Sequence, residues 1–269
     1  WQTGLAFQTE PVGGFGQSVS SVNANGNQSR NNGSGDIGWQ GIGRISGRPW
    51  MIDETKFWHF GVSAGHTTVN NQYRADGTFS QANATAGQNS GGMSFVGFLG
   101  TNVDRTNVLN TGNLTSGSND SPDARRIDSY DRYGAETALV YGPFSAQAEY
   151  LRTNINGLNY SGEHLTGYYG YLSYFLTGES RAYHVRNGAW NRIVPNKSFH
   201  WNGTGLGAWE FAVGYDYLNM NNGKIRGGEA DMIRFALNWY PHTHVRVMTN
   251  VNHVLNLNTA GVVNYNAAG

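Results

Sequence analysis

The stretch GAWEFAVGYDYLNM, residues 207–220, decides the fold. Large apolar side chains occupy every second position from 209 to 217, and smaller or acidic side chains fill the positions between them. Because successive side chains of a strand point to opposite faces, the stretch predicts a strand with one apolar and one polar face. A tilted strand of about 9–11 residues also spans the hydrocarbon core of a bilayer. The apolar set is Trp209, Phe211, Val213, Tyr215 and Tyr217, and the polar set is Glu210, Ala212, Gly214 and Asp216.

Segments with the same alternation recur along the chain. The clearest pair is 129–141 and 144–153, which the dipeptide Gly142-Pro143 joins in a tight turn. Many such strands with aromatic residues near their ends are typical of an all-β fold, the transmembrane antiparallel β-barrel. We expect about twelve strands in one barrel domain over residues 1–269. The clearest candidates are 1–9, 37–46, 57–69, 93–99, 105–113, 129–141, 144–153, 165–176, 207–220, 232–240 and 244–255.

Polar segments rich in Gly and Asn separate many of these strands. Short connections, such as 47–56 and 241–243, alternate with longer ones along most of the chain. A barrel with short turns on one side of the membrane and long loops on the other requires such an alternation. Residues 177–204 show no clear period, and we expect an extended connection there. The long outer loops are expected near 10–36, 70–91, 114–126, 154–164 and 221–229.

The composition fits this fold and excludes others. The mean hydropathy is −0.50 and no run of about 18 apolar residues occurs, which argues against helical membrane spans. Eighteen basic and eighteen acidic residues cancel, which gives no reason to expect a nucleic-acid partner. Cysteine is absent, which constrains the compartment only weakly. Trp1 already falls in a strand pattern, so we expect a chain either trimmed of its signal peptide or beginning within a longer protein.

The polar faces of the predicted strands carry many charges. Lipid offers no hydrogen bonds, so a spanning sheet must close on itself, and its inward side chains must line water or plug the lumen. Two interpretations of the inward arginines stay open: they attract anions, or they pair with carboxylates inside the barrel. We expect Arg132 to lie between Glu136 and Glu149, which the tight turn makes neighbours. The expected pore-lining residues are Arg44, Arg132, Glu136, Glu149, Glu210, Asp216, Arg234, Asn238, Arg246 and Asn250.

A histidine pair, two carboxylates and several aromatic residues are the other candidate sites in the sequence. His242 and His244 are two residues apart, but a metal site needs a third ligand and this spot is a turn, so we expect solvated histidines and no metal. No nucleophile or cofactor motif accompanies Glu136 and Glu149, so we expect neither an enzyme nor a cofactor. Amphipathic aromatic rings prefer the membrane–water interface. The expected interface aromatics are Trp39, Trp58, Tyr141, Trp209 and Trp239.

Four motifs resemble one known family. The run GYLSYFLTGESR at 170–181 is similar to the YFLTGESR segment of the phosphate-selective porins O and P. The paired motifs YGAE at 133–136 and YGPF at 141–144 resemble that family's paired strands. GAWE at 207–210 and LNWY at 237–240 resemble a strand start and a strand end of the family, in the same order.

The resemblance implies a function. Members of this family form sixteen-stranded barrels that assemble as trimers in the Gram-negative outer membrane, among lipid and lipopolysaccharide, and pass phosphate or related anions. By this resemblance the chain is the later part of such a barrel, without the first strands and the end of the last one. We therefore expect a passive diffusion channel for small anions, with phosphate as a solute that the resemblance suggests. The alternative is a plugged or structural outer-membrane barrel whose loops contact other surfaces.

Overall fold

The computed structural model describes residues 2–10, 38–68, 95–98, 108–111, 114, 127–157, 160–185 and 188–259. Side chains at 2–10, 38, 39 and 128 lie outside this description. Among the described residues, no helix is both long and apolar enough to cross a membrane.

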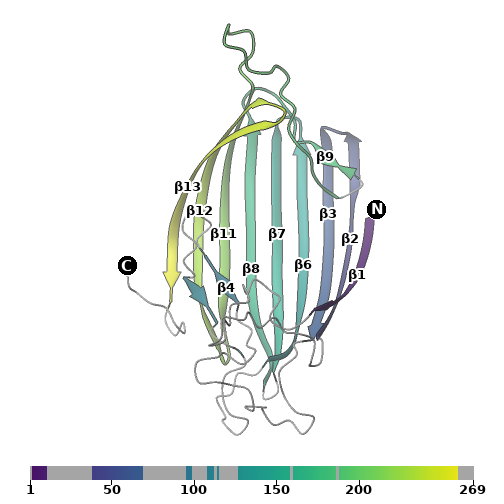
Figure 1. Ribbon diagram of the computed structural model, residues 1–269, viewed down its shortest axis with the longest axis vertical. Coiled ribbons are helices and arrows are strands. Elements are labelled where there is room, and N and C mark those ends of the chain that lie inside the picture. Colours follow the sequence, from purple (N-terminus) through teal and green to yellow (C-terminus); the bar gives the residue numbers. More distant parts are fainter. Residues whose placement is uncertain are drawn as a thin grey trace, which may run out of the picture.

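Nine long strands form a single antiparallel sheet (Figure 1). Each strand pairs with the one before and after it in the sheet, so the sheet is a meander that curves into a trough. Within the described residues no pairing joins its two edge strands. In sheet order the strands are β1 (Gln2–Glu10), β2 (Gly38–Asp53), β3 (Lys56–Thr68), β6 (Ile127–Tyr141), β7 (Phe144–Gly157), β8 (Tyr160–Phe175), β11 (Ala208–Asn222), β12 (Ile225–His242) and β13 (Val245–Asn258).

Four short strands form two separate pairs. β4 (Val96–Gly97) pairs with β5 (Leu109–Asn110), and β9 (Tyr183–His184) pairs with β10 (Ala189–Trp190). The sequence predicted wall strands at 93–99 and 105–113, but in their described parts these segments pair with each other and not with the large sheet. A strand of the large sheet would expose its apolar side chains to lipid. Leu109 is instead buried among apolar side chains.

Two of the expected loops are strands instead. β7 continues to Gly157 and β8 begins at Tyr160, so the predicted loop at 154–164 is wrong. The predicted loop at 221–229 is also wrong, because only residues 223–224 separate β11 from β12. In both places the hydrogen-bonded pairing of the strands continues beyond the apolar band. Polar side chains there meet water, so apolar and polar residues need not alternate in the sequence. The expected loops at 10–36, 70–91 and 114–126 lie almost wholly outside the described residues.

Connection lengths do not alternate as strictly as the sequence suggested. Two-residue turns close one end of the sheet at 54–55, 142–143 and 243–244, and Gly142 has the left-handed φ of 60° that such a turn needs. The long connection from β8 to β11, residues 176–207, leaves from this same end. We call it the tight-turn end and the opposite one the loop end.

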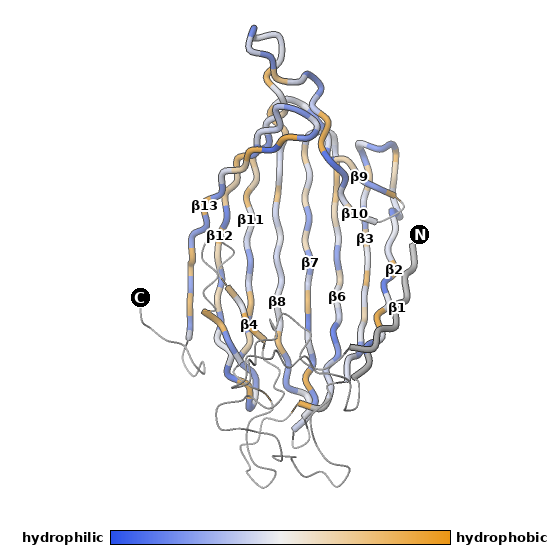
Figure 2. The backbone as a smooth tube through the Cα atoms, viewed as in Figure 1, coloured by the Kyte–Doolittle hydropathy of each residue, from blue (hydrophilic) through white to orange (hydrophobic). Residues whose placement is uncertain are grey.

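The two faces of the sheet differ in polarity. Residues directly opposite each other on paired antiparallel strands point to the same side of the sheet. The pairing of each strand with the next therefore assigns every residue to one of the two faces. Phe60, Val62 and Phe211 belong to the convex face, where they are exposed, whereas His59, Ser173 and Glu210 belong to the concave face, where they are buried. Figure 2 shows hydrophilic and hydrophobic residues interspersed along the wall strands, as a two-faced sheet requires.

Candidate functional site

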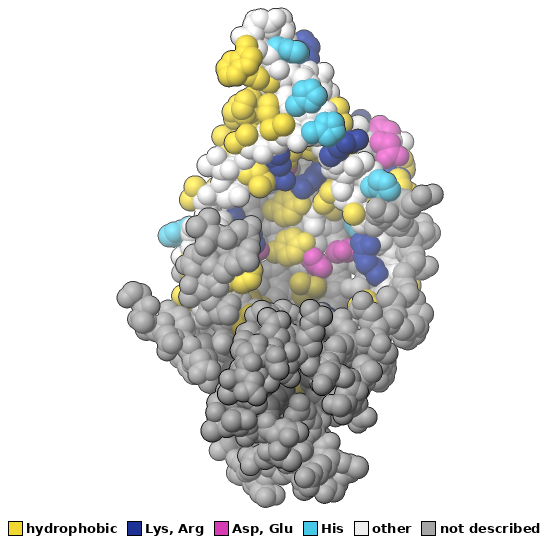
Figure 3. All heavy atoms as spheres, in the orientation of Figure 1, with side chains coloured by type: hydrophobic (Ala, Val, Ile, Leu, Met, Phe, Trp, Pro, Cys, Tyr) yellow, Lys and Arg dark blue, Asp and Glu magenta, His cyan; other side chains and the backbone are white. Residues whose placement is uncertain are grey.

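The concave face gathers the polar side chains that the sequence singled out. The register runs from Glu136 to Glu149, from Glu149 to Tyr169 and from Tyr169 to Asp216 without leaving this face. Figure 3 shows the sheet hollowed on this side, with acidic and basic side chains in the hollow. The residues that share the face are Arg44, Arg132, Glu136, Glu149, Glu210, Asp216, Arg234, Asn238, Arg246 and Asn250.

Glu136 is the centre of an ion-pair network. Its Oε1 accepts from Nε of Arg44 at 3.0 Å and, in a still shorter contact, from Nη2 of the same guanidinium. Nε2 of His59 lies 3.2 Å from the same oxygen. The sequence predicted that Arg132 offsets the repulsion between Glu136 and Glu149, but the cation bonded to Glu136 is Arg44. The Arg132 guanidinium lies 5.3 Å from the ring centre of Tyr130.

Glu149 is held by a neutral hydroxyl group. The Tyr169 hydroxyl donates to its Oε2 at 2.7 Å. The neighbouring Tyr171 hydroxyl donates to Oε1 of Gln147 at 2.6 Å. The two carboxylates therefore differ in their partners. Glu136 is bonded to Arg44 and His59, whereas Glu149 is bonded to the Tyr169 hydroxyl.

The connection from β8 to β11 folds over this wall. We call its described residues 177–185 and 188–193 the inward segment. The Tyr183 hydroxyl lies 2.8 Å from Nδ1 of His59, and Nη2 of Arg44 donates to the Gly188 carbonyl at 3.2 Å. Nε1 of Trp190 donates to Oε1 of Gln147 at 2.5 Å. The inward segment is thus bonded to β2, β3 and β7, three strands of the wall, which no local pattern in residues 177–204 indicated.

Tyr183 joins the inward segment to His59 and Phe57 of β3. Burial raises the pKa of Tyr183, so its hydroxyl stays protonated at neutral pH. The hydroxyl and Nδ1 of His59 share one hydrogen bond, whose donor depends on the tautomer of the imidazole, and Nε2 of the same ring faces Glu136. The ring of Tyr183 also packs 5.2 Å from the ring of Phe57, which fixes β9 against β3.

Arg181 of the inward segment lies between aromatic rings. Its guanidinium is 4.7 Å from the ring centre of Trp190 and 5.2 Å from that of Tyr171. Nη1 of Arg181 lies 3.9 Å from Oε1 of Glu210. The other oxygen of Glu210 accepts from Nδ2 of Asn238 at 3.0 Å and from the Tyr240 hydroxyl at 2.8 Å.

The remaining inward arginines also have partners. Arg234 forms a two-point pair with Asp216. Nη2 of Arg246 donates to Oδ1 of Asn238 at 3.2 Å. Arg44 and Arg234 are therefore paired with carboxylates, as one of the two interpretations expected, and Arg246 contacts an amide; the attraction of anions stays a prediction.

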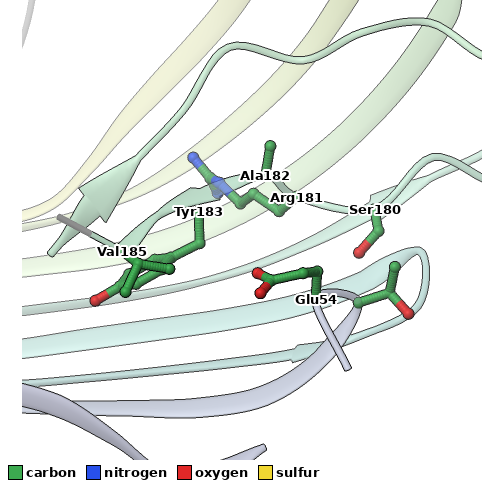
Figure 4. Close-up of a pocket in the computed structure, with 7 residues that line it drawn as sticks. Glu54, Ser180, Arg181, Ala182, Tyr183 and Val185 are labelled. Atoms are coloured by element: carbon green, nitrogen blue, oxygen red, sulfur yellow. The ribbon is translucent and has the colours of Figure 1, made fainter. Parts of the chain in front are cut away.

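A pocket of about 470 Å³ lies where the inward segment meets the turn between β2 and β3. Glu54 and Thr55 of the turn form one side, and residues 180–183 with Val185 form the other. In Figure 4 the Arg181 side chain extends away from Glu54. Nη1 of Arg48 donates to Oε2 of Glu54 at 2.9 Å, so the carboxylate at the pocket rim is paired.

At the loop end the same concave face is apolar. Leu109 and Leu114 are buried against Tyr130, Ile155 and Leu165 of the wall. Met220, Ile225, Tyr160, Ile127 and Ala230 complete this cluster, and Phe95, Val108 and Leu218 pack on it. The hollow is therefore polar toward the tight-turn end and apolar toward the loop end.

The convex face carries aromatic residues near both ends. Trp58 and Tyr141 are 43% and 55% exposed at the tight-turn end, where the rings of Trp209 and Trp239 stack with centres 5.5 Å apart. The predicted interface residue Trp39 has no described side chain. A second set, which the sequence did not predict as interface residues, lies toward the loop end: Tyr133, Tyr150, Tyr168 and Tyr217. Eight residues separate Trp209 from Tyr217, about 26 Å along a strand, which matches the height of an outer-membrane apolar band.

No group of three or more metal-ligating side chains occurs among the described residues. The rings of His242 and His244 are 6.3 Å apart, and Nη1 of Arg192 lies 3.2 Å from Nε2 of His244. The positive charge of this guanidinium would repel a metal cation bound at His244. His242 ends β12, and His244 lies in the turn that follows.

A long antiparallel meander with a lipid-compatible convex face and a charged concave face defines the porin class of outer-membrane proteins. The model of the family "Phosphate-selective porin O and P" matches residues 43–260, and the chain belongs to that family. It is therefore a bacterial outer-membrane protein.

Two relatives give the scale of the likeness. The chain is 32% identical over 127 residues to Porin O of Pseudomonas aeruginosa, a match that covers 43% of this chain and 27% of that protein. It is 36% identical over 118 residues to an uncharacterized protein of Caulobacter vibrioides, over 44% of this chain and 23% of that protein. The matched segment thus spans about a quarter of each relative.

Proposed function

We propose that this protein forms a passive diffusion channel for small anions in the outer membrane. The observation that carries the proposal is the concave face, where ten polar residues separated widely in sequence share one side of a curved sheet. Transport of this kind needs no bond making, because lumen charge and constriction radius set selectivity. The proposal gives the protein no enzymatic role.

Arginine is the reason to favour anions. Fifteen of the eighteen basic residues of the chain are arginines, whose planar fork matches carboxylate and phosphate. In this proposal Arg44, Arg132, Arg234 and Arg246 attract anions, and Glu136 and Asp216 hold Arg44 and Arg234 in place. The family description names phosphate, so phosphate is the first solute to test.

The inward segment supplies the constriction in this proposal. It is bonded to three wall strands and lies over the polar part of the concave face, so solutes that cross the lumen pass beside it. We further propose, from the family, one barrel domain of sixteen strands in the full protein that assembles as a homotrimer among lipid and lipopolysaccharide.

A second candidate is a plugged or structural barrel. The apolar cluster of Leu109 and Leu114 against the wall favours it, because this packing fills part of the hollow at the loop end. The two candidates differ in conductance. Reconstitution of the full-length protein into planar bilayers in KCl tests them: an anion channel gives single-channel steps that added phosphate reduces. Bilayers without steps support the plugged barrel, and cation-selective steps contradict the proposed solute class.

A further inference from the structure

Arg181 is held in one place by stacking. The rings of Trp190 and Tyr171 lie 4.7 Å and 5.2 Å from its guanidinium, and its side chain is 21% exposed. A guanidinium carries five N–H donors, so its contacts with these rings leave donors available for an anion. By contrast, Arg44 and Arg234 are hydrogen-bonded to Glu136 and Asp216 through two donors each.

Glu210 places a fixed negative charge beside this cation. Its Oε1 lies 3.9 Å from Nη1 of Arg181, which is longer than a hydrogen bond. Asn238 and Tyr240 hold the other oxygen, and the residue is buried. A buried carboxylate is little screened by salt, so an anion that approaches Arg181 also meets the field of Glu210.

We propose that Arg181 and Glu210 form a subsite that accepts monovalent oxyanions, carboxylates above all, and disfavours divalent ones. This inference rests on the proposed channel function and names its solute class. A carboxylate satisfies the edge of Arg181 with two oxygens and a single charge. The second charge of a divalent anion gains little from Arg181, because Glu210 already offsets that cation, and it is repelled by the carboxylate.

The test uses formate and sulfate, which are monovalent and divalent at pH 7. Reversal potentials of the full-length protein in planar bilayers give the permeability of each anion relative to chloride. In Glu210→Gln the sulfate-to-formate permeability ratio should rise at least about threefold, because one unit charge a few ångströms from the anion is removed. Glu54→Gln is the matched control: it removes a carboxylate that is 63% exposed at the turn between β2 and β3 and paired with Arg48, and the ratio should stay near the wild-type value.

A second variant keeps the proposal falsifiable if Glu210→Gln does not fold. Arg181→Lys retains the charge but loses the planar fork and the stacking, so formate permeability relative to chloride should fall at least about threefold. Equal sulfate-to-formate ratios in Glu210→Gln and wild type, an equal rise in Glu54→Gln, or an unchanged formate preference in Arg181→Lys would overturn the subsite. A wild-type protein without any conductance would instead contradict the channel itself, and the subsite with it.

Discussion

Gly61 lies directly opposite Glu136, and its missing side chain is what lets Glu136 reach Arg44 two strands away. A β-carbon at Gly61 would collide with the Glu136 carboxylate. The carboxylate therefore lies over β3 and pairs with a cation of β2, instead of with Arg132 on its own strand. The glycine thus leaves the space in which the pair of Glu136 and Arg44 forms.

Gly61→Ala should destabilise the protein by about 1–3 kcal/mol, because overpacking forces the carboxylate away from Arg44 and His59. The measurement is urea-induced unfolding of the protein in detergent or lipid. Gly170→Ala is the control, since a β-carbon there would meet its nearest atoms at 3.6 and 3.8 Å, ordinary contact distances. Equal stability of the two variants would contradict the role of Gly61.

Glu136→Gln should raise single-channel conductance and current noise, because the inward segment loses the anion that orders both Arg44 and His59. Planar bilayer recordings of the full-length protein measure both quantities. Glu149→Gln removes the same charge from the same face, but its partner is Tyr169 and not the inward segment, so its noise should stay at the wild-type level. If both variants behave alike, lumen charge and not the anchoring network sets the conductance.

Tyr183→Phe should cost about 0.5–1.5 kcal/mol at neutral pH through the lost hydrogen bond to His59. The pKa of Tyr183 is raised by burial, so its contribution is present below the unfolded value near about 10 and is lost as the pH rises through the higher folded pKa. The stability difference between wild type and Tyr183→Phe should therefore shrink above about pH 10. A pH-independent difference would mean that Tyr183 is not buried in the folded protein.

The alternation of side chains predicted most of the wall. Because the strand period is 2, parity alone placed Arg44 and Arg246 on one face although the chain between them is long. Parity could not predict partners: Arg132 was the nearest cation to Glu136 along β6, yet the space above Gly61 favours Arg44. Apolar and polar residues do not alternate in the inward segment, so its sequence predicts no strand. Its position depends on contacts between distant parts of the chain, such as the hydrogen bond from Trp190 to Gln147.

Leu109→Ala should destabilise the protein by about 2–5 kcal/mol, because Leu109 is buried in the apolar cluster at the loop end. Urea unfolding in lipid measures this change. Trp201→Ala is the control, since Trp201 is 96% exposed and its loss should change stability by no more than about 0.5 kcal/mol. A neutral Leu109→Ala would show that β5 does not pack against the wall.

The central claim is that the charged concave face conducts anions. Its most direct test is the reversal potential of the full-length protein across a planar bilayer in a KCl gradient, for wild type and for a variant with Arg44, Arg132, Arg234 and Arg246 changed to Glu. The account predicts anion selectivity in the wild type and its loss in the variant, with channels of similar open time. Selectivity that is unchanged by the four substitutions, or a wild type that prefers potassium, would contradict it.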